Sequence, residues 1–137
     1  DAVLRVLRAS IAGLTPGKIW SQWQAEAEDL VAQECVGLGL LKPKDLKVKV
    51  TDPSKKPVKK WFMHGNGHPI GLDVHDLGHM NQPFAVGWVM TVEPAIYIPE
   101  EDLAVRLEND VLITENGPVD LMADIPIEAE EIEAMMK

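Results

Sequence analysis

The sequence predicts an α+β domain in which helices come first along the chain and a mainly antiparallel sheet follows. Apolar residues recur at helical spacing over the first 40 residues, and the period changes to two beyond residue 88. The order of helix, helix, strands and terminal helix is typical of the α+β class. The 137 residues fit one domain, and this length is sufficient to bury a hydrophobic core.

Two apolar stripes define the N-terminal helices. The first consists of Val3, Leu4, Leu7, Ile11 and Leu14. Gly13 and Pro16 break this pattern. The second consists of Trp20, Trp23, Ala27, Leu30, Val31, Cys35 and Leu38. Gly37 ends the second helix, and Cys35 is predicted to be a core residue because nothing near it in the sequence would make its thiol a nucleophile.

A basic segment, residues 42–60, follows the helices. It holds eight lysines against two acidic residues, contains three prolines and lacks helical periodicity. These features predict an extended or looped connection at the surface. The run from Lys55 to Lys60 resembles a nuclear-import signal, but a solvated loop is the preferred interpretation.

The rest of the chain is predicted to form strands and a final helix. Alternating side chains predict one strand at Val89–Val92 and another over residues 105–110. Asn116-Gly117 is a typical two-residue hairpin turn between strands at 111–114 and 119–122. A helix is predicted from about Pro126, with glutamates near its positive N-terminus. Its packing face would consist of Ile132, Met135 and Met136.

Composition narrows the classes of partner. The chain has 13 Lys and Arg residues against 22 Asp and Glu residues, a net charge of −9 and a pI of about 4.8. This balance argues against nucleic acid or an anionic membrane as a partner. No apolar run approaches the roughly 20 residues that span a bilayer. A single cysteine, Cys35, excludes an intrachain disulfide and favours a reducing compartment, so we expect a cytoplasmic location.

All four histidines, His64, His68, His75 and His79, lie in one glycine-rich segment. His64 and His68 have the spacing of a helical zinc pair, but the glycines and the proline between residues 65 and 71 make a helix there very costly. The same glycines miss the dinucleotide-binding fingerprint, because the third is one residue late. What remains is a backbone that approaches a ligand closely while imidazoles project from it.

Two carboxylates on separate strands add to this pattern. Glu93 ends an otherwise apolar strand, and Glu108 shares a strand face with Arg106 and Asp110. An ordinary exposed strand face would look similar. One imidazole and two carboxylates would nevertheless suit a divalent ion such as Mn²⁺, Co²⁺, Fe²⁺ or Zn²⁺, with Arg106 supporting a ligand from the second shell.

Three ordered motifs carry a resemblance to a known family. They are His64-Gly-Asn-Gly-His68-Pro-Ile-Gly-Leu-Asp-Val-His75-Asp, Thr91-Val-Glu93-Pro-Ala-Ile-Tyr and Val105-Arg106-Leu-Glu108-Asn-Asp. They resemble the motifs of the Xaa-Pro aminopeptidase and prolidase group of pita-bread metallopeptidases. The resemblance extends in weaker form over nearly the whole chain, and it implies that residues 1–137 form the C-terminal part of one pita-bread catalytic domain.

The resemblance implies a role for each matched residue. His68 and Glu93 would ligate one of two divalent metal ions, manganese in the first place with cobalt, zinc or iron as alternatives, and Glu108 would bridge both. His64 and His75 would lie beside the substrate and stabilise charge on the scissile carbonyl oxygen, and Arg106 would orient a ligand carboxylate. A metal-bridging hydroxide would attack the carbonyl carbon, and Glu93 would pass a proton to the leaving nitrogen.

The remaining acidic and histidine side chains of the segment have no implied ligand role. Asp73, Asp76 and His79 are expected to be structural, with Asp73 supporting the glycine-rich backbone.

The chain also departs from the family pattern. The two metal-binding aspartates of the family lie on strands upstream of the first helix matched here, and this sequence starts at Asp1 inside that helix. Three of five ligands are therefore expected, and we expect little or no activity from these residues alone. Pro69 after the ligand histidine and Ala95 in place of a usual glycine are smaller departures.

The predicted function is a proline-specific exopeptidase that hydrolyses the Xaa-Pro bond at a peptide N-terminus. One alternative is a prolidase, which cleaves Xaa-Pro dipeptides. Another is a metal-free pita-bread module that binds a peptide or a partner protein, although the retained His68, Glu93 and Glu108 argue against it. The expected partners are a peptide with proline in second position and the N-terminal part of the same domain. The oligomeric state is left open, with a homo-oligomer among the options.

Overall fold

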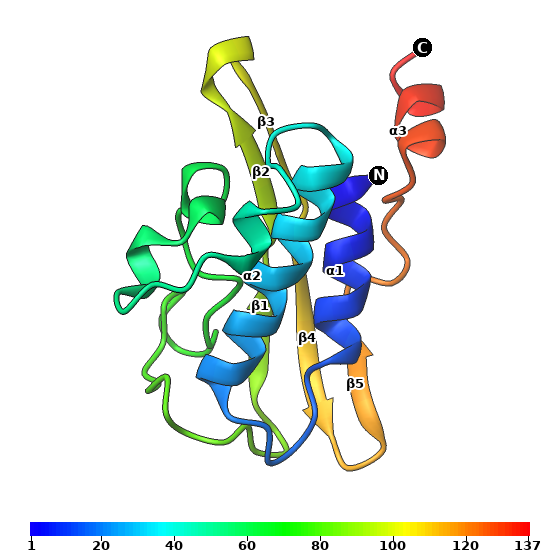
Figure 1. Ribbon diagram of the computed structural model, residues 1–137. Helices are drawn as coiled ribbons and strands as arrows, with labels where there is room; N and C mark the ends of the chain where they lie inside the picture. The colour runs from blue at the N-terminus through cyan, green and yellow to red at the C-terminus, as the bar shows by residue number, and fades with distance from the viewer.

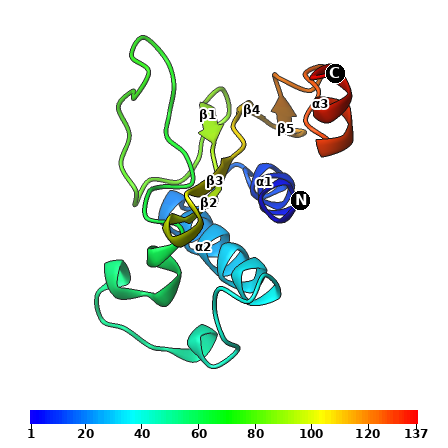
Figure 2. The same cartoon turned by 90° about the horizontal axis from the view of Figure 1, so that it is seen from above.

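Two helices cover one side of a set of antiparallel strands. The computed structural model describes residues 1–137. Helix α1 (Ala2–Ala12) runs in one direction and helix α2 (Trp20–Gly37) returns beside it, both packed against the strands (Figures 1 and 2). Both helices lie where the apolar stripes predicted them. The structure contains no helix that combines the length and the apolar character needed to cross a membrane.

The strands form two antiparallel ladders. Strands β1 (Val89–Val92), β4 (Asn109–Thr114) and β5 (Gly117–Asp120) form a three-stranded sheet in the order β1-β4-β5. Strands β2 (Ala95–Ile98) and β3 (Leu103–Arg106) form a separate pair. A short 3-10 turn, Pro99–Glu101, connects β2 to β3 at the far end of a long projecting ribbon (Figure 1). The prediction of an α+β fold is confirmed.

The prediction of one strand over residues 105–110 is wrong, because the ladder is interrupted within it. Val92 pairs with Asn109 on one side of the interruption, and Ala95 pairs with Arg106 on the other. The two ladders therefore share one register, which sets Glu93 opposite Glu108 and Pro94 opposite Leu107. Leu107 donates its N–H to the Pro94 carbonyl at 3.4 Å, but Pro94 has no N–H to donate in return.

The hairpin between β4 and β5 lies one residue earlier than predicted. Thr114 pairs with Gly117, so Glu115 and Asn116 form the two-residue turn and Gly117 starts β5. Gly117, the first residue after the turn, has a positive φ of 114°. The Thr114 hydroxyl donates to the Gly117 carbonyl at 2.6 Å. β5 also ends at Asp120, two residues before the predicted end.

The core lies between the helices and the strands in two adjoining clusters. In the first, both helices meet Val58, Trp61, Phe62 and Ile96. In the second, Leu7 and Trp23 pack on the inward side chains of β1 and β4. Cys35 is completely buried, and burial raises the pKa of its thiol to about 11, which confirms it as a core residue.

The basic segment is more ordered than the predicted solvated loop. It consists of three short 3-10 turns, Asp45–Lys47, Pro53–Lys55 and Pro57–Lys60. Lys56 and Lys59 each place Nζ 2.8 Å from a carboxylate oxygen of Glu28, a buried residue of α2. Two lysines that the sequence pattern assigned to a solvated surface are thus drawn onto α2 by a buried counter-charge.

The C-terminal helix is shorter and less packed than predicted. Helix α3 spans Ala129–Met135, so it begins three residues after Pro126. The side chains of Met135 and Met136 are 73% and 82% exposed, and α3 lies at the margin of the molecule (Figure 2). The predicted packing face is therefore wrong, and Ile127, which precedes the helix, is the residue that reaches the core.

We expect Leu7→Ala to lower the free energy of unfolding by about 2–5 kcal/mol, because Leu7 is only 1% exposed and its removal leaves a cavity beneath β1 and β4. Urea denaturation of the variant measures this loss. Leu38→Ala is the matched control, since Leu38 is 53% exposed, and its effect should stay within about 0.5 kcal/mol. Equal losses in both variants would contradict the assignment of the core.

Candidate metal centre

The segment around His68 pairs along the edge of β1 that β4 leaves free. The His68 carbonyl accepts the Thr91 N–H at 2.9 Å, and the Asn66 carbonyl accepts the Glu93 N–H at 2.8 Å. A side chain at position 67 is excluded, because a Cβ on Gly67 would lie 1.9 Å from the Thr91 carbonyl oxygen. The glycine thus permits the close backbone approach that the sequence predicted, although only Pro69 and Met90 form a regular bridge.

Strand alternation brings three predicted ligands onto one face. Met90 and Val92 are fully buried toward the helices, so Thr91 and Glu93 project from the opposite face of β1. Glu108 is the cross-strand neighbour of Glu93 in the shared register, and His68 lies opposite Thr91. The face that carries the charged groups is the one that the helices leave uncovered.

The three side chains form a compact cluster of ligand atoms. One ligand atom each from His68, Glu93 and Glu108 lie within 4.8 Å of one another, and His68 Nε2 is 3.7 Å from Glu93 Oε1. The side chains of His68 and Glu93 are only 18% and 15% exposed. His68 Nδ1 is 2.9 Å from the Pro69 carbonyl, which only accepts, so Nδ1 carries the proton and the lone pair of Nε2 points to the cluster. One imidazole nitrogen and two carboxylates fit a divalent cation.

Arg106 lies beside this cluster, as predicted. Its Nη1 is 3.7 Å from Glu93 Oε2, and its guanidinium donates to the Tyr97 hydroxyl. The hydrogen bond to Tyr97, followed by the nearby charges of Glu93 and Glu108, raises the pKa of Arg106 above its ordinary value. Arg106 therefore stays charged and offsets part of the negative charge of the two carboxylates.

His64 is not part of the cluster but connects to it through Tyr97. The Tyr97 hydroxyl lies 2.9 Å from His64 Nε2, and His64 Nδ1 lies 2.7 Å from the Gly65 carbonyl. Because Arg106 donates to Tyr97, the hydroxyl proton is directed to His64 Nε2, and both ring nitrogens of His64 are engaged. Tyr97 belongs to the second sequence motif, Thr91–Tyr97, but the sequence predicted no role for it.

His75 packs directly on the predicted ligand. Its ring is exposed and meets the His68 ring edge to face, with 4.2 Å between the ring centroids. Asp73 was expected to support the glycine-rich backbone, but its side chain does not do so. That role belongs to Asp76, whose carboxylate accepts the N–H groups of Leu72 and Leu77.

Sequence reasoning also missed polar residues behind the site. Gln24 and Glu28 are buried on α2, and Asn66 is fully buried in the histidine segment. A signal was present in the sequence, since positions 24 and 28 continue the four-residue spacing of Trp20 within the apolar stripe. Polar residues at two successive core positions indicate an internal partner.

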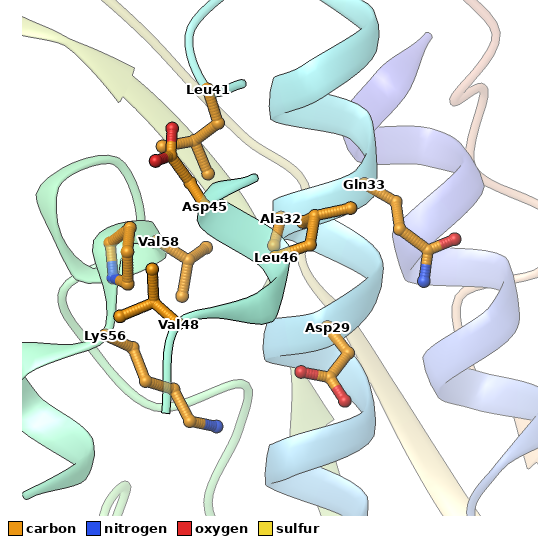
Figure 3. A pocket seen from close by; sticks show the side chains of 10 residues that line it. Asp29, Ala32, Gln33, Leu41, Asp45, Leu46, Val48, Lys56 and Val58 are labelled. Atoms are coloured by element: carbon orange, nitrogen blue, oxygen red, sulfur yellow. The ribbon is translucent and has the colours of Figure 1, made fainter. Parts of the chain in front are cut away.

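Two of the cavities beside the basic segment adjoin α2. One, of about 260 Å³, lies between α2 and residues 41–58 and is lined by Asp29, Leu46 and Val48, among others (Figure 3). The second, of about 720 Å³, is bordered by His64 and Gly65 as well as by Lys56 and Lys59. Neither is lined by His68, Glu93 or Glu108.

The chain is similar to known peptidases over almost its whole length. The model of metallopeptidase family M24 matches residues 1–115. Xaa-Pro aminopeptidase of Escherichia coli K12 is 36% identical over 148 residues, which covers 99% of this chain and 33% of that protein. Xaa-Pro aminopeptidase 3 of Mus musculus is 35% identical over 144 residues, which covers 97% of this chain and 27% of that protein. The chain thus spans about a third of the length of the curated relatives it matches.

The chain is also similar in structure to solved aminopeptidases. Aminopeptidase P from E. coli, determined with the inhibitor Pro-Leu, has a TM-score of 0.84 and 34% identity, covering 99% of this chain and 33% of that one. The structure of Pseudomonas aeruginosa aminopeptidase PepP has a TM-score of 0.85 and 31% identity, covering 98% and 33%. A zinc-substituted form of the E. coli enzyme in complex with product also matches, with a TM-score of 0.84. These likenesses confirm the predicted fold class, a partial pita-bread fold.

We expect His68→Ala and Glu108→Ala in the full-length protein to weaken Mn²⁺ binding by at least about 100-fold, because each removes one ligand of the cluster. Isothermal titration calorimetry measures the affinity. His79→Ala is the matched control, since His79 lies in the same segment but outside the cluster, and its affinity should be unchanged. Normal Mn²⁺ binding by His68→Ala would contradict the assignment.

Proposed function

The chain belongs to metallopeptidase family M24, and from that premise we propose that the full-length protein is a metal-dependent Xaa-Pro aminopeptidase. It would release the first residue of a peptide whose second residue is proline. The observation that carries this proposal is the convergence of His68, Glu93 and Glu108 at the interruption of the ladder. The similar E. coli and mouse proteins are Xaa-Pro aminopeptidases, which supports the proposal.

We assign the metal-binding residues from the donor set. His68, Glu93 and Glu108 would hold divalent ions, and the likeness to family M24 implies that Glu108 is shared between two of them. Mn²⁺ is the first choice for one nitrogen and several oxygen donors. When bound, two such ions lower the pKa of a water molecule and stabilise charge on a carbonyl oxygen. The remaining chemistry falls to the side chains of this chain.

Four side chains would act on the substrate or on the ligands. His75, whose exposed ring contacts the His68 ring, would donate a ring N–H to the oxygen of the scissile carbonyl. Glu93 would move a proton to the leaving proline nitrogen, and Arg106, 3.7 Å away, fixes the direction of its carboxylate. His64 would reach the same carbonyl oxygen only by exchanging its bond to Tyr97, so we propose that substrate binding breaks that bond.

We further propose a cytoplasmic location and a peptide as the main partner. The lone cysteine is buried with a raised pKa, which suits a reducing compartment where disulfides are rare. A homo-oligomer remains an open part of the proposal.

The test is hydrolysis of matched peptides by the full-length, Mn²⁺-loaded protein. We expect release of the first residue from an Xaa-Pro-Yaa tripeptide and at least about 100-fold slower release from Xaa-Ala-Yaa, because the site must recognise the proline ring. Removal of the metal with a chelator, His68→Ala and Glu108→Ala should each abolish turnover, whereas His79→Ala should retain it. Mass spectrometry of the products measures both rates.

Other outcomes would contradict the proposal in different ways. Cleavage of Xaa-Pro dipeptides without cleavage of tripeptides would identify a prolidase. Absence of hydrolysis together with absence of Mn²⁺ binding would identify a binding module. Equal cleavage of alanine and proline peptides would refute proline specificity.

A further inference from the structure

Behind the candidate metal centre, α2 carries two buried polar residues that the proposed mechanism does not use. Gln24 and Glu28 are 8% and 5% exposed. They lie one helical turn apart, on the side of α2 that faces the basic segment and the histidine segment. Buried polar side chains are costly without partners, so their hydrogen bonds indicate what they do.

Gln24 is held in one orientation by contacts at both ends of its amide. Its Oε1 accepts the backbone N–H of Asn66 at 2.6 Å, and its Nε2 donates to Glu28 Oε1 at 3.1 Å. Reversal of the amide would set Nε2 against an N–H donor and Oε1 against a carboxylate. Glu28 and the Asn66 N–H therefore select the same orientation of the Gln24 amide.

Two lysines keep Glu28 charged. Lys56 Nζ and Lys59 Nζ each lie 2.8 Å from one of its oxygens. Burial opposes ionisation of Glu28, but the hydrogen bonds from Lys56, Lys59 and Gln24 outweigh it, and the pKa of this carboxyl lies below its ordinary value. The basic segment thus holds Glu28 in its charged form through two lysines.

The contact of Gln24 with Asn66 leads to a predicted metal ligand. The Asn66 residue that donates its N–H to Gln24 accepts the Glu93 N–H on its carbonyl, at 2.8 Å. Two residues further on, the His68 N–H donates to the side-chain Oγ1 of Thr91 at 3.0 Å, and the His68 carbonyl accepts the Thr91 N–H. The backbone of Gly67 lies so close to the Thr91 carbonyl that residues 66–68 have little room to shift along β1.

We propose that Gln24, oriented by the Glu28–Lys56–Lys59 cluster, is a positioning residue that sets the distance between His68 and Glu93. It anchors the Asn66 peptide to α2, and that peptide in turn fixes the backbone of Glu93. The inference rests on the proposed function, since it treats His68 and Glu93 as metal ligands. Gln24 itself would touch neither metal nor substrate.

The first test measures the anchor directly, by hydrogen exchange in the full-length protein without metal. Gln24→Met removes the acceptor of the Asn66 N–H while it keeps the length of the side chain, and the adjoining 720 Å³ cavity leaves space for Glu28 to be solvated. Exchange of the Asn66 N–H should accelerate by at least about 10-fold. Gln22→Met is the matched control, because Gln22 is exposed on the same helix. Unchanged exchange in Gln24→Met would overturn the proposal.

The second test measures positioning, by calorimetric titration with Mn²⁺. Gln24→Met should weaken Mn²⁺ binding by about 10-fold, the usual effect of a group that orients a ligand, and Gln22→Met should not weaken it. Faster exchange of Asn66 with unchanged Mn²⁺ affinity would show that Gln24 anchors Asn66 without positioning His68 and Glu93. That result would also overturn the proposal.

A second variant keeps the proposal testable if Gln24→Met does not fold. Glu28→Gln should accelerate exchange of Asn66 and lower Mn²⁺ affinity, because it removes the charged acceptor of Gln24 Nε2, one of the two contacts that orient this amide. Glu34→Gln is its control, since Glu34 also pairs with a cation, but that cation is Arg5 of α1 and not a lysine of the basic segment. Identical behaviour of the two variants would refute the role of Glu28. Both readouts are taken without substrate, so a failure to cleave Xaa-Pro peptides would refute the proposed function and leave this inference standing.

Discussion

The arrangement of the candidate centre depends on the antiparallel register that the β1–β4 and β2–β3 ladders share. Pro94 cannot donate an N–H, so the ladder that joins β1 to β4 stops there and resumes as the β2–β3 pair in the same register. The shared register sets Glu93 and Glu108 side by side, and no backbone bond joins them because the Glu93 N–H points to the Asn66 carbonyl at the other edge of β1. Since both carboxylates fall on the face that the helices leave open, a bound ion could reach both.

This pairing has an electrostatic consequence. Like charges directly opposite each other on neighbouring strands are destabilising, and Glu93 is only 15% exposed, so water screens it poorly. Arg106 offsets part of this repulsion from 3.7 Å away, but one cation does not balance two carboxylates. A divalent ion between them would supply the missing positive charge. The cross-strand repulsion is therefore best understood as a feature of a metal-binding site rather than of a strand pair on its own.

The sequence predicts local features well and long-range pairings poorly. The α1 and α2 stripes, the burial of Cys35 and the strand at Val89–Val92 follow from periodicity, which depends only on neighbours along the chain. The motifs also single out His68, Glu93 and Glu108, and the structure brings these three side chains into one cluster. The break at Pro94 was visible as a proline, but its effect depends on Leu107 being its partner. The exposed face of α3 could not be foreseen, because an apolar pattern predicts burial only where another surface lies against it.

The buried Glu28 cluster is easier to explain by position than by stability. A buried ion pair recovers little more than the cost of removing its charges from water, so an apolar group of similar volume at position 28 would stabilise the domain about as well. An apolar group, however, would offer no acceptor to Gln24 Nε2 and no counter-charge to the two lysines. The charged cluster accepts one arrangement only, because each oxygen of Glu28 has its own lysine and Gln24 has a distinct donor and acceptor end. The basic segment thus supplies fixed charges that hold α2 to the histidine segment, and its lysines belong to the framework of the site.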